Sequence, residues 1–453
     1  MAEAVRHDKT ARQLRLLSDA LDSGRLGPVR RLVNTLSPAE IGNLLESLPP
    51  AQRVVVWGLV DPEDDGEVLV HVGDEVRESL LADMDPDEIV AAVEDLDIDD
   101  LADLVEDLPD TVIDEVLKSM DRENRERLEQ VLSYDEDTAG RLMNPDVVTV
   151  RTDTTVDVVL RYLRLRGELP EHTDHLYVVS RRHQYLGRIA LQSLLLHDAS
   201  TPINQLIDDA QSAIGVDEPD LEVARQFSDH DWISAPVVDH NNILLGRITI
   251  DDVVDIIREQ AEHQALGAAG LDEDEDLFSP VPRAFRRRLL WLSINLATAF
   301  LASSVVGRFE GTIEKIVALA VLMPIVAGMG GNAGTQVLAL MVRGLALGQV
   351  GASNVRVLLW KELRVAAMNG ITLGVVLGLV VWLWFGDPAL SLVIGSALTI
   401  NLLFAASAGV LVPLTLKRLG FDPALAGGVI LTTVTDVMGF LAFLGLATLI
   451  LLR

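Results

Sequence analysis

One aspartate lies in the stretch Gly427-Gly428-Val429-Ile430-Leu431-Thr432-Thr433-Val434-Thr435-Asp436-Val437-Met438-Gly439-Phe440, within an apolar run, 424–452, that is long enough to cross a lipid bilayer. An ionisable side chain in a membrane span costs several kcal/mol unless it faces a bundle interior or a water-filled path. On a helix, Thr432, Thr433 and Gly439 share one face with this aspartate. A carboxylate flanked by hydroxyl groups suits an ion path, and the alternative is that Asp436 is a neutral or hydrogen-bonded packing residue between spans.

The charge of the chain is divided unevenly. Residues 1–283 hold 62 acidic and 25 basic side chains, whereas residues 284–453 hold 6 acidic and 12 basic ones. We therefore expect several domains in different environments. The acidic part would repel the phosphates of nucleic acid, which favours cations or basic partners and no nucleic acid. The sequence has no cysteine, so disulfides and thiolate metal sites are excluded.

Residues 1–140 are predicted to form an α-helical, superhelical N-domain of short stacked helices. The segments Ser37-Pro38-Ala39-Glu40 and Asp85-Pro86-Asp87-Glu88 both have the sequence of a capping box with proline at the first helical position. Apolar residues at helical spacing follow the second box: Ile89, Val90, Val93, Leu96, Leu101, Leu104, Val105 and Leu108. Residues 61–140 also hold 30 acidic and 5 basic side chains. Such an excess is either an ordinary solvated surface or a cation-binding one.

Residues 141–250 contain two copies of a helix followed by two strands. The first copy has its helix at 155–163 and strands at 175–180 and 185–191. The second copy has its helix at 221–227 and strands at 233–238 and 243–250. Paired copies of this length resemble a CBS-domain pair, an α/β regulatory module that often binds adenine nucleotides.

The second copy carries a candidate nucleotide motif, Gly246-Arg247-Ile248-Thr249-Ile250-Asp251-Asp252. It matches the Gly-x-Ile-Thr-x-x-Asp pattern of CBS domains, in which the hydroxyl of Thr249 and the carboxylate of Asp252 can meet a ribose. The resemblance implies ATP or another adenine nucleotide at the CBS pair, and the alternative role of Asp252 is an ordinary helix cap. The first copy has Ala190 and Ser193 at these positions and lacks both groups.

Residues 251–284 are predicted to form a connecting helix, 251–266, followed by a linker. Asp255, Glu259 and Glu262 lie on the polar side of this helix. The linker contains an acidic run at 272–276 and then Ser279-Pro280-Val281-Pro282, which should break any helix before the next basic cluster.

Five apolar spans are predicted in a transmembrane domain at 285–453, near 289–306, 316–347, 355–385, 389–416 and 424–452. The first 26 residues are charged and hold no signal-peptide core, so we expect the N-terminus in the cytoplasm. The cytosolic flanks and loops are then richer in basic residues than the outer ones, as the positive-inside rule requires. The sequence thus predicts a multi-pass protein of the cell membrane with its C-terminus outside.

The second span contains Met323-Pro324-Ile325-Val326-Ala327-Gly328-Met329-Gly330-Gly331-Asn332-Ala333-Gly334-Thr335-Gln336. Many glycines beside a proline are expected to break the helix and expose backbone carbonyls, which is tolerated at membrane depth only inside protein or beside a water-filled path. The alternative is close helix packing, which also favours glycine. Asn332, Thr335 and Gln336 favour the path.

The order of an acidic helical domain, a CBS pair, a connecting helix and five spans resembles the MgtE family of magnesium channels or transporters over essentially the whole chain. The segments of this chain that resemble the membrane domain of that family are Arg288-Leu289-Leu290-Trp291, Asn295-Leu296, Phe309-Glu310, Met323-Pro324, Gly330-Gly331-Asn332-Ala333-Gly334-Thr335-Gln336 and Thr435-Asp436-Val437-Met438-Gly439. The resemblance implies a homodimer in the lipid bilayer, with a pore at or near the subunit interface where Asp436 helps to hold a hydrated Mg²⁺. It also implies that cytosolic Mg²⁺ bridges the N-domain, the CBS pair and the connecting helices and holds the pore shut.

Mg²⁺ dehydrates reluctantly, so a pore needs only a few oxygen ligands from the protein. The candidate pore residues are Asp436, Asn332, Thr335, Gly331 and Thr432. The candidate sensing residues are Asp95, Asp99, Glu94, Asp217, Asp220, Asp251, Asp252, Asp255, Glu259 and Glu262.

Sensing would follow from repulsion between acidic surfaces. Two carboxylates ~4 Å apart repel by roughly 4 kcal/mol at an effective dielectric near 20, so they separate until divalent ions sit between them. Moving a gate from 1:99 to 99:1 needs about 5.5 kcal/mol, and one site at ten times its Kd supplies only about 1.4, so several sites are required. The connecting helix also contains Arg258, Gln260, His263 and Gln264, and is less acidic than the resemblance leads us to expect.

The sequence argues against two other classes of function. An intramembrane aspartyl protease needs two carboxylates that share a proton, and only Asp436 lies deep in a span, since Asp387 and Asp422 stand at loop ends. The sequence therefore does not predict an enzyme. A cation-coupled secondary transporter of divalent metal ions would be expected to have more intramembrane ionisable groups or inverted repeats.

Overall fold

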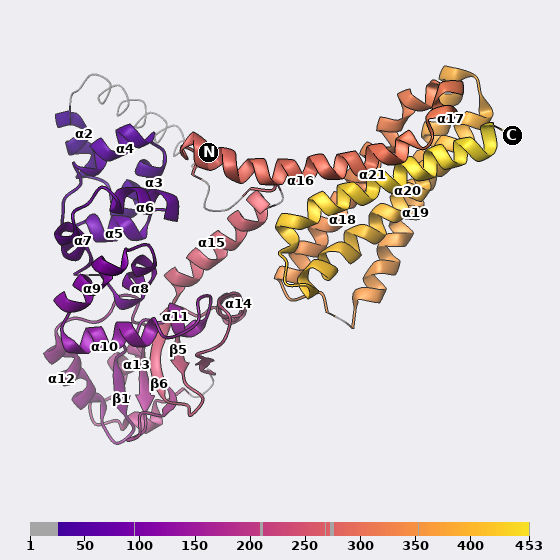
Figure 1. Cartoon of the computed structure of the whole chain (residues 1–453). Helices are drawn as coiled ribbons and strands as arrows, with labels where there is room; N and C mark the ends of the chain where they lie inside the picture. The colour runs from indigo at the N-terminus through magenta and orange to yellow at the C-terminus, as the bar shows by residue number, and fades with distance from the viewer. Residues whose placement is uncertain are drawn as a thin grey trace. The chain divides into compact units, whose positions relative to one another are not determined.

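The computed structural model describes residues 26–94, 96–208, 212–267, 269–271, 276–351 and 353–452. The chain forms two compact units, both drawn in Figure 1. The first unit comprises residues 1–259 and 274–279, and the second comprises residues 260–273 and 280–453. Asp95, one of the candidate sensing residues, lies outside the described residues.

Short helices build the N-domain, as expected. They are α2 (Leu26–Val33), α3 (Pro38–Glu46), α4 (Pro50–Trp57), α5 (Asp65–Val70), α6 (Asp74–Leu81), α7 (Pro86–Val93), α8 (Ile98–Glu106), α9 (Asp110–Ser119), α10 (Arg122–Val131) and α11 (Ala139–Leu142). The capping boxes at the starts of α3 and α7 are confirmed, because Glu40 and Glu88 accept hydrogen bonds from the cap backbone of Ser37 and Asp85. In Figure 1 the helices stack one on the next along the N-domain.

The N-domain helices repeat a contact made by an arginine. Nε of Arg53 on α4 donates to the carbonyl of Leu45 at 3.0 Å, and Nε of Arg77 on α6 donates to the carbonyl of Leu69 at 3.1 Å. In both cases the carbonyl belongs to the residue eight positions earlier. The two arginines thus join α4 to α3 and α6 to α5, and they satisfy carbonyl groups at the ends of α3 and α5.

The CBS pair consists of two three-stranded sheets of the same topology. The first sheet pairs β1 (Thr149–Arg151) in parallel with β2 (His175–Val179), which pairs antiparallel with β3 (Tyr185–Ala190). The second repeats this with β4 (Ile214–Gly215), β5 (Ser234–Val238) and β6 (Leu244–Thr249). The helices of this region are α12 (Val156–Arg166), α13 (Leu191–Leu196), the single turn η1 (Ile203–Gln205) and α14 (Asp220–His230). The predicted helices and strands of both copies are confirmed.

The N-domain and the second CBS copy share one hydrophobic core. A single cluster of buried side chains runs from Val29 through Leu69 and Leu101 to Phe227 and Ile256. The first CBS copy has a core of its own around Val178. Backbone hydrogen bonds between Asn144 and Arg247 of β6 tie the end of the N-domain to the second sheet. The start of α15 (Ile250–Gly267) packs into the shared core through Val253 and Ile256.

In the second unit, five helices are long and apolar enough to cross a membrane, which confirms the predicted number of spans among the described residues. They are α16 (Val281–Gly307), α18 (Ala318–Ala346), α19 (Val355–Phe385), α20 (Pro388–Arg418) and α21 (Pro423–Leu451), with the short α17 (Glu310–Lys315) between the first two. Large apolar side chains stay exposed, such as Leu383 at 74% and Val375 at 67%. An exposed apolar surface of this kind is covered by lipid in a membrane protein.

The expected break in the second span does not occur. Helix α18 runs without interruption from Ala318 to Ala346, with Pro324 inside it. Two of its glycines serve close packing instead: a Cβ on Gly330 would lie 2.1 Å from Nδ2 of Asn401, and a Cβ on Gly334 would lie 2.9 Å from Cδ1 of Leu431. The glycines therefore let α20 and α21 approach, and the backbone stays in the helical hydrogen-bond pattern.

Candidate functional site

The candidate pore residues lie on α18 and α21, which run side by side. Gly334 of α18 meets Leu431 of α21, and four residues further along α18 Leu338 meets Gly427, earlier on α21. The two helices are therefore antiparallel in this region. In this register Asn332 of α18 lies level with Thr433 of α21 and Thr335 lies level with Ile430. The candidate side chains of the two helices are therefore spread over about 9 Å along the helix axes.

The hydroxyl groups of the candidate threonines donate their hydrogens to the backbone. Oγ1 of Thr432 donates to the carbonyls of Gly428 and Val429 at 3.0 and 3.1 Å, and Oγ1 of Thr335 donates to the carbonyl of Asn332 at 3.0 Å. A hydroxyl that donates in this way keeps its lone pairs free to accept. Thr335 and Thr432 are exposed, so they offer oxygen acceptors on the outside of the single bundle.

Asp436 is half-buried and follows Thr432 by one turn of α21. Among the described residues its carboxylate has no hydrogen-bond or ion-pair partner. The ion-path role of Asp436 and its role as a neutral or hydrogen-bonded packing residue therefore both stay predictions. Gly331 faces open space, with no atom within 4 Å of an added Cβ, and its helical carbonyl is not a free ligand.

Asn401 on α20 is a site residue that the sequence reasoning missed. Its side chain is fully buried, and Nδ2 donates to the carbonyl of Val326 on α18 at 2.9 Å. It also fills the space left by two glycines, Gly330 of α18 and Gly439 of α21. Asn401 thus fixes the two helices that carry the candidate pore residues. An isolated amide in an apolar span was the signal that could have identified it.

A second site gathers acidic side chains of the N-domain and of α15. Burial and the charge of Asp251 raise the pKa of Asp252 to about 8. Burial and the charge of Asp252 raise the pKa of Asp99, on α8, well above its usual range. Burial and the charge of Asp97 raise the pKa of Asp100 to about 7. The structure therefore brings Asp99 of the N-domain together with Asp251 and Asp252, as a sensing surface requires.

Asn144 lies at the centre of this acid cluster, which we define as Asp97, Asp99, Asp100, Asp251 and Asp252. Nδ2 of Asn144 donates to Asp97 at 3.1 Å and to Asp99 at 3.2 Å, and the side chain is only 3% exposed. Sequence reasoning missed Asn144, Asp97 and Asp100, because their proximity to α15 depends on the docking of the N-domain against the second CBS copy. In isolation they were part of a long acidic run.

The other candidate sensing residues lie elsewhere. Asp255 follows the acid cluster on α15, and burial raises its pKa against the opposing charges of Arg258 and His71. Asp217 is exposed and lies 3.3 Å from Nε2 of His240, and Asp220 is half-buried at the start of α14.

Glu94, Glu259 and Glu262 are exposed. Among the described residues, no three acidic or histidine side chains are close enough to hold a bare metal ion.

The candidate nucleotide residues are engaged with each other. The hydroxyl of Thr249 donates to Asp251 and also to Oδ2 of Asp252, and the backbone N–H of Thr249 donates to Asp252 at 3.2 Å. Thr249 is 5% exposed. Asp252 thus accepts hydrogen bonds at the start of α15, as expected for its alternative role as a helix cap.

The end of α15 meets the start of α21 in the second unit. Nε2 of His263 lies 3.0 Å from Oδ2 of Asp422. Asp422 also caps α21 by accepting hydrogen bonds from the N–H groups of Ala424 and Leu425 at 2.9 and 3.0 Å. The helix that carries Asp436 is thus joined at its first turn to the connecting helix.

Comparisons with known proteins agree with this architecture. Family models match at 36–137 (MgtE intracellular N domain), at 139–200 and 213–259 (CBS domain) and at 323–446 (MgtE, divalent cation transporter). The magnesium transporter MgtE of Thermus thermophilus is 32% identical over 440 residues, which are 96% of this chain and 98% of that protein. The chain belongs to the MgtE family.

Further relatives of the MgtE family are similar over comparable lengths. The magnesium transporter MgtE of Enterococcus faecalis is 30% identical over 438 residues, which are 96% of each protein. A crystal structure of the cytosolic domain of the Mg²⁺ channel MgtE in complex with ATP is 31% identical, covers 53% of this chain and 98% of that one, and has a TM-score of 0.48. Membership of a transporter family confirms that the chain is not an enzyme and excludes the protease alternative.

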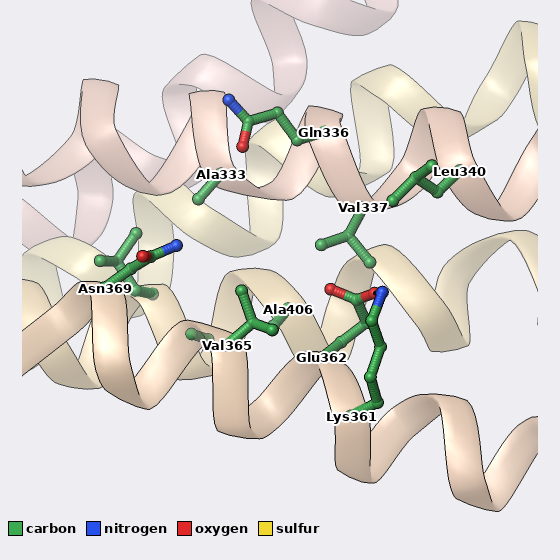
Figure 2. Close-up of a pocket in the computed structure, with 11 residues that line it drawn as sticks. Ala333, Gln336, Val337, Leu340, Lys361, Glu362, Val365, Asn369 and Ala406 are labelled. Carbon is green, nitrogen blue, oxygen red and sulfur yellow. Dashed lines mark hydrogen bonds and ion pairs between the residues drawn. The ribbon is translucent and has the colours of Figure 1, made fainter.

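The MgtE membrane region also holds a second ionisable group that sequence reasoning missed. Glu362 on α19 is 5% exposed, and its Oε1 accepts from Nζ of Lys361 at 2.6 Å. Both line a cavity of about 200 Å³ between α18, α19 and α20, shown in Figure 2. Asn369 and Gln336 line the same cavity. In the sequence, Glu362 stands between the basic residues Lys361 and Arg364, near the start of the span, so its burial is not visible from the local pattern.

Proposed function

We propose that this MgtE chain carries Mg²⁺ across the cell membrane as a homodimeric channel or transporter, and that cytosolic Mg²⁺ closes it. Relatives that match nearly the whole chain are magnesium transporters. The observation that carries the proposal is Asp436, a carboxylate inside a membrane helix with no protein partner among the described residues. Thr432, one turn earlier on α21, and Thr335, on the adjacent α18, are exposed and keep oxygen lone pairs free to accept. A hydrated Mg²⁺ is held by such acceptors through its own waters.

The position of these groups supports the homodimer. Asn332, Thr335 and Thr432 are exposed on a single bundle. Polar groups facing lipid at this depth would cost free energy. A second copy facing the first encloses them, and the two Asp436 carboxylates then share one water-filled path in which divalent cations are concentrated. With five spans, the N-terminus lies in the cytoplasm and the C-terminus outside.

Closure by Mg²⁺ is supported by the acid cluster. Burial and mutual repulsion raise the pKa of Asp99, Asp100 and Asp252, so without a cation the contact between α8 and α15 is strained when these groups are ionised. Mg²⁺ between the carboxylates removes the repulsion and holds the N-domain against α15. Asp217, Asp220, Glu94, Glu259 and Glu262 provide weaker, more exposed positions.

ATP or another adenine nucleotide is the proposed regulatory ligand of the CBS pair. It would have to release Thr249 from Asp251 and Asp252 to reach the predicted ribose contacts. Nucleotide and Mg²⁺ would therefore act on the same two carboxylates. Isothermal titration of the whole protein with ATP, with and without Mg²⁺, measures this directly, and absence of heat in both titrations would remove the nucleotide from the proposal.

The decisive experiment replaces Asp436 by asparagine in purified protein reconstituted in liposomes. Asp436→Asn keeps the shape and the hydrogen-bonding capacity but removes the charge, so Mg²⁺ flux should fall by about an order of magnitude or more. Asp436→Glu, which keeps the charge, is the matched control and should retain more flux. A stable, dimeric Asp436→Asn protein with wild-type flux would contradict the proposed path.

A cation-coupled transporter is the second candidate, because Glu362 adds another ionisable group to the membrane unit. Coupled transport requires a second ion to move with Mg²⁺. Reversal potentials measured while Mg²⁺, Na⁺ and pH are varied in turn distinguish the two. A potential set by Mg²⁺ alone supports a channel, whereas a shift with Na⁺ or pH supports coupling.

A further inference from the structure

A buried ion pair fixes the linker that follows α15 to the N-domain. Nη2 of Arg53 donates to Oδ2 of Asp276 at 2.7 Å, and the two side chains are 3% and 9% exposed. Oε2 of Glu75 accepts from the backbone N–H of Asp276 at 3.2 Å and from the hydroxyl of Ser279 at 2.6 Å. All four residues belong to the first compact unit. The linker segment 276–279 is therefore held by one positive and one negative side chain of the N-domain.

In the repeat of the N-domain, Asp276 of the linker pairs with Arg53 as Asp107 of the N-domain itself pairs with Arg77. Arg77 repeats the carbonyl contact of Arg53, and its Nη1 donates to Asp107, which follows it by 30 residues within the N-domain. Asp83 follows Arg53 by the same interval. Yet Asp83 is exposed, and among the described residues its carboxylate has no hydrogen bond or ion pair. Arg53 is paired instead with an acid from far along the chain.

Two consequences follow from burial. Arg53 is 2% exposed, so removal of the segment would leave its buried charge without the carboxylate of Asp276. Glu75, 8% exposed, would lose two hydrogen bonds from the segment. Asp83 stands 30 residues after Arg53, as Asp107 does after Arg77, and is therefore a candidate partner for Arg53 if the segment leaves.

We propose that the N-domain carries a docking site, made by Arg53 and Glu75, for the linker segment 276–279, and that this docked segment links the acid cluster to the first membrane helix. Ser279 lies directly before Pro280, the N-cap residue of α16. A rearrangement of the N-domain on Mg²⁺ binding therefore reaches α16 through this segment as well as along α15. The docking stands on the contacts alone, whereas the linkage rests on the proposed function.

Docking is tested by cross-linking in the full-length protein, which has no cysteine of its own. Glu75→Cys combined with Ser279→Cys should form an intramolecular disulfide, because these side chains touch while Arg53 and Asp276 still hold the segment. Val54→Cys with Ser279→Cys is the control, since Val54 is adjacent to Arg53 but 44% exposed. Adding Asp276→Asn should lower the yield of the first disulfide. Equal yields for the two cysteine pairs, or none for the first, would overturn the docking.

Linkage is tested by Mg²⁺ flux into liposomes at increasing internal Mg²⁺. Asp276→Asn should leave flux at low internal Mg²⁺ within about twofold and raise the Mg²⁺ needed for half-inhibition about fivefold, as expected for loss of one charge-assisted hydrogen bond. Asp276→Glu keeps the charge and should restore part of the sensitivity. Asp107→Asn breaks the equivalent pair with Arg77 inside the N-domain and should have a smaller effect.

The two tests separate the two claims. If the wild-type protein is inhibited by internal Mg²⁺ and Asp276→Asn is inhibited equally, the linkage is wrong. If the wild-type protein shows no inhibition at all, the proposed closure by Mg²⁺ fails, so the linkage fails with it, and the disulfide yields still decide whether the segment docks.

Discussion

At the residue scale, the pore candidates depend on where each hydroxyl hydrogen goes. Thr432 and Thr335 donate to backbone carbonyls of their own helices, which leaves their oxygen lone pairs free to accept. On a helix surface that faces lipid, the same lone pairs would have no ion or water to bind. In the proposed pore, these acceptors on α18 and α21 would meet the waters of a hydrated ion.

Thr432→Val should lower Mg²⁺ flux about fivefold, because it removes one acceptor of roughly 1 kcal/mol while keeping the shape of the side chain. Thr432→Ser should retain most of the flux. Thr415→Val on α20 is the control, since Thr415 is exposed and makes the same backbone bond, to Leu411 at 2.7 Å, away from the candidate path. Flux assays in liposomes measure all three, and an equal loss in Thr415→Val would contradict a specific role of Thr432.

Lys361→Gln should destabilise the membrane unit by about 1–3 kcal/mol, since Glu362 would stay buried without its cation and Lys361 is itself partly solvated. Lys361 is 57% exposed on its side chain, whereas Glu362 is 7% exposed. Lys417→Gln, at an exposed helix end, is the matched control. Thermal unfolding in detergent provides the measurement, and equal melting temperatures for the two variants would show that Glu362 needs no partner.

At the element scale, glycines of α18 and α21 decide how closely the helices pack. Gly330 and Gly439 both face Asn401, and Gly334 faces Leu431. Gly328 and Gly331 of the same helix face open space. The glycine-rich motif therefore has two faces, one that packs against α20 and α21 and one that is turned away from the bundle.

Gly330→Ala should destabilise the protein by about 1–3 kcal/mol or more, because its Cβ would overlap the buried side chain of Asn401. Gly328→Ala adds the same methyl group where no atom lies within 4 Å, so it should be tolerated or slightly stabilising. Thermal unfolding of the two variants in detergent tests the assignment. Similar losses in both would mean that the motif is needed for backbone freedom rather than for packing.

At the scale of the whole molecule, the N-domain and the second CBS copy share one hydrophobic core. Charged groups of the two domains are therefore close enough to interact, as Asp99 and Asp252 do. The acid cluster lies where α8 meets α15. Its carboxyl groups have raised pKa values because burial and neighbouring carboxylates disfavour ionisation. The contact therefore becomes repulsive as these groups ionise, at and above neutral pH, and a cation can relieve this repulsion.

In metal-free protein, the contact between α8 and α15 should loosen as the pH rises. Asp100 and Asp252 have pKa values of about 7 and about 8, raised above their usual value, so their contribution to the contact is complete at low pH and is lost as the pH passes through these values. Hydrogen exchange of α8 should therefore be slower at pH 6 than at pH 8.5, after correction for the intrinsic rate. Mg²⁺ should slow exchange more at pH 8.5, where it replaces the lost protons.

Asp252→Asn is the control for this dependence. It removes a group whose pKa is raised to about 8, so the hydrogen exchange of α8 should change less with pH. Asp217→Asn, which alters an exposed carboxylate beside His240, should leave the dependence of α8 unchanged. Exchange of α8 that is independent of both pH and Mg²⁺ would contradict a role of the cluster in sensing.

The sequence by itself determined the features that depend on neighbouring residues. Five long apolar runs became five helices, and the cap sequences at Ser37 and Asp85 became capping boxes, since both follow from local periodicity and local hydrogen bonding. The paired strands of the CBS copies followed in the same way. It also singled out Asp436, because a charge inside an apolar run is visible without knowledge of its surroundings.

Only the tertiary structure decided what depends on distant contacts. It showed that α18 continues through its glycines, because Asn401 and Leu431 fill the space that those glycines leave. It joined Asn144 to Asp97 and Asp99, and Arg53 to Asp276, across 47, 45 and 223 positions of sequence. No local pattern predicts such pairs, because each partner alone looks like an ordinary polar or charged surface residue. Only the packing of separate elements buries them together.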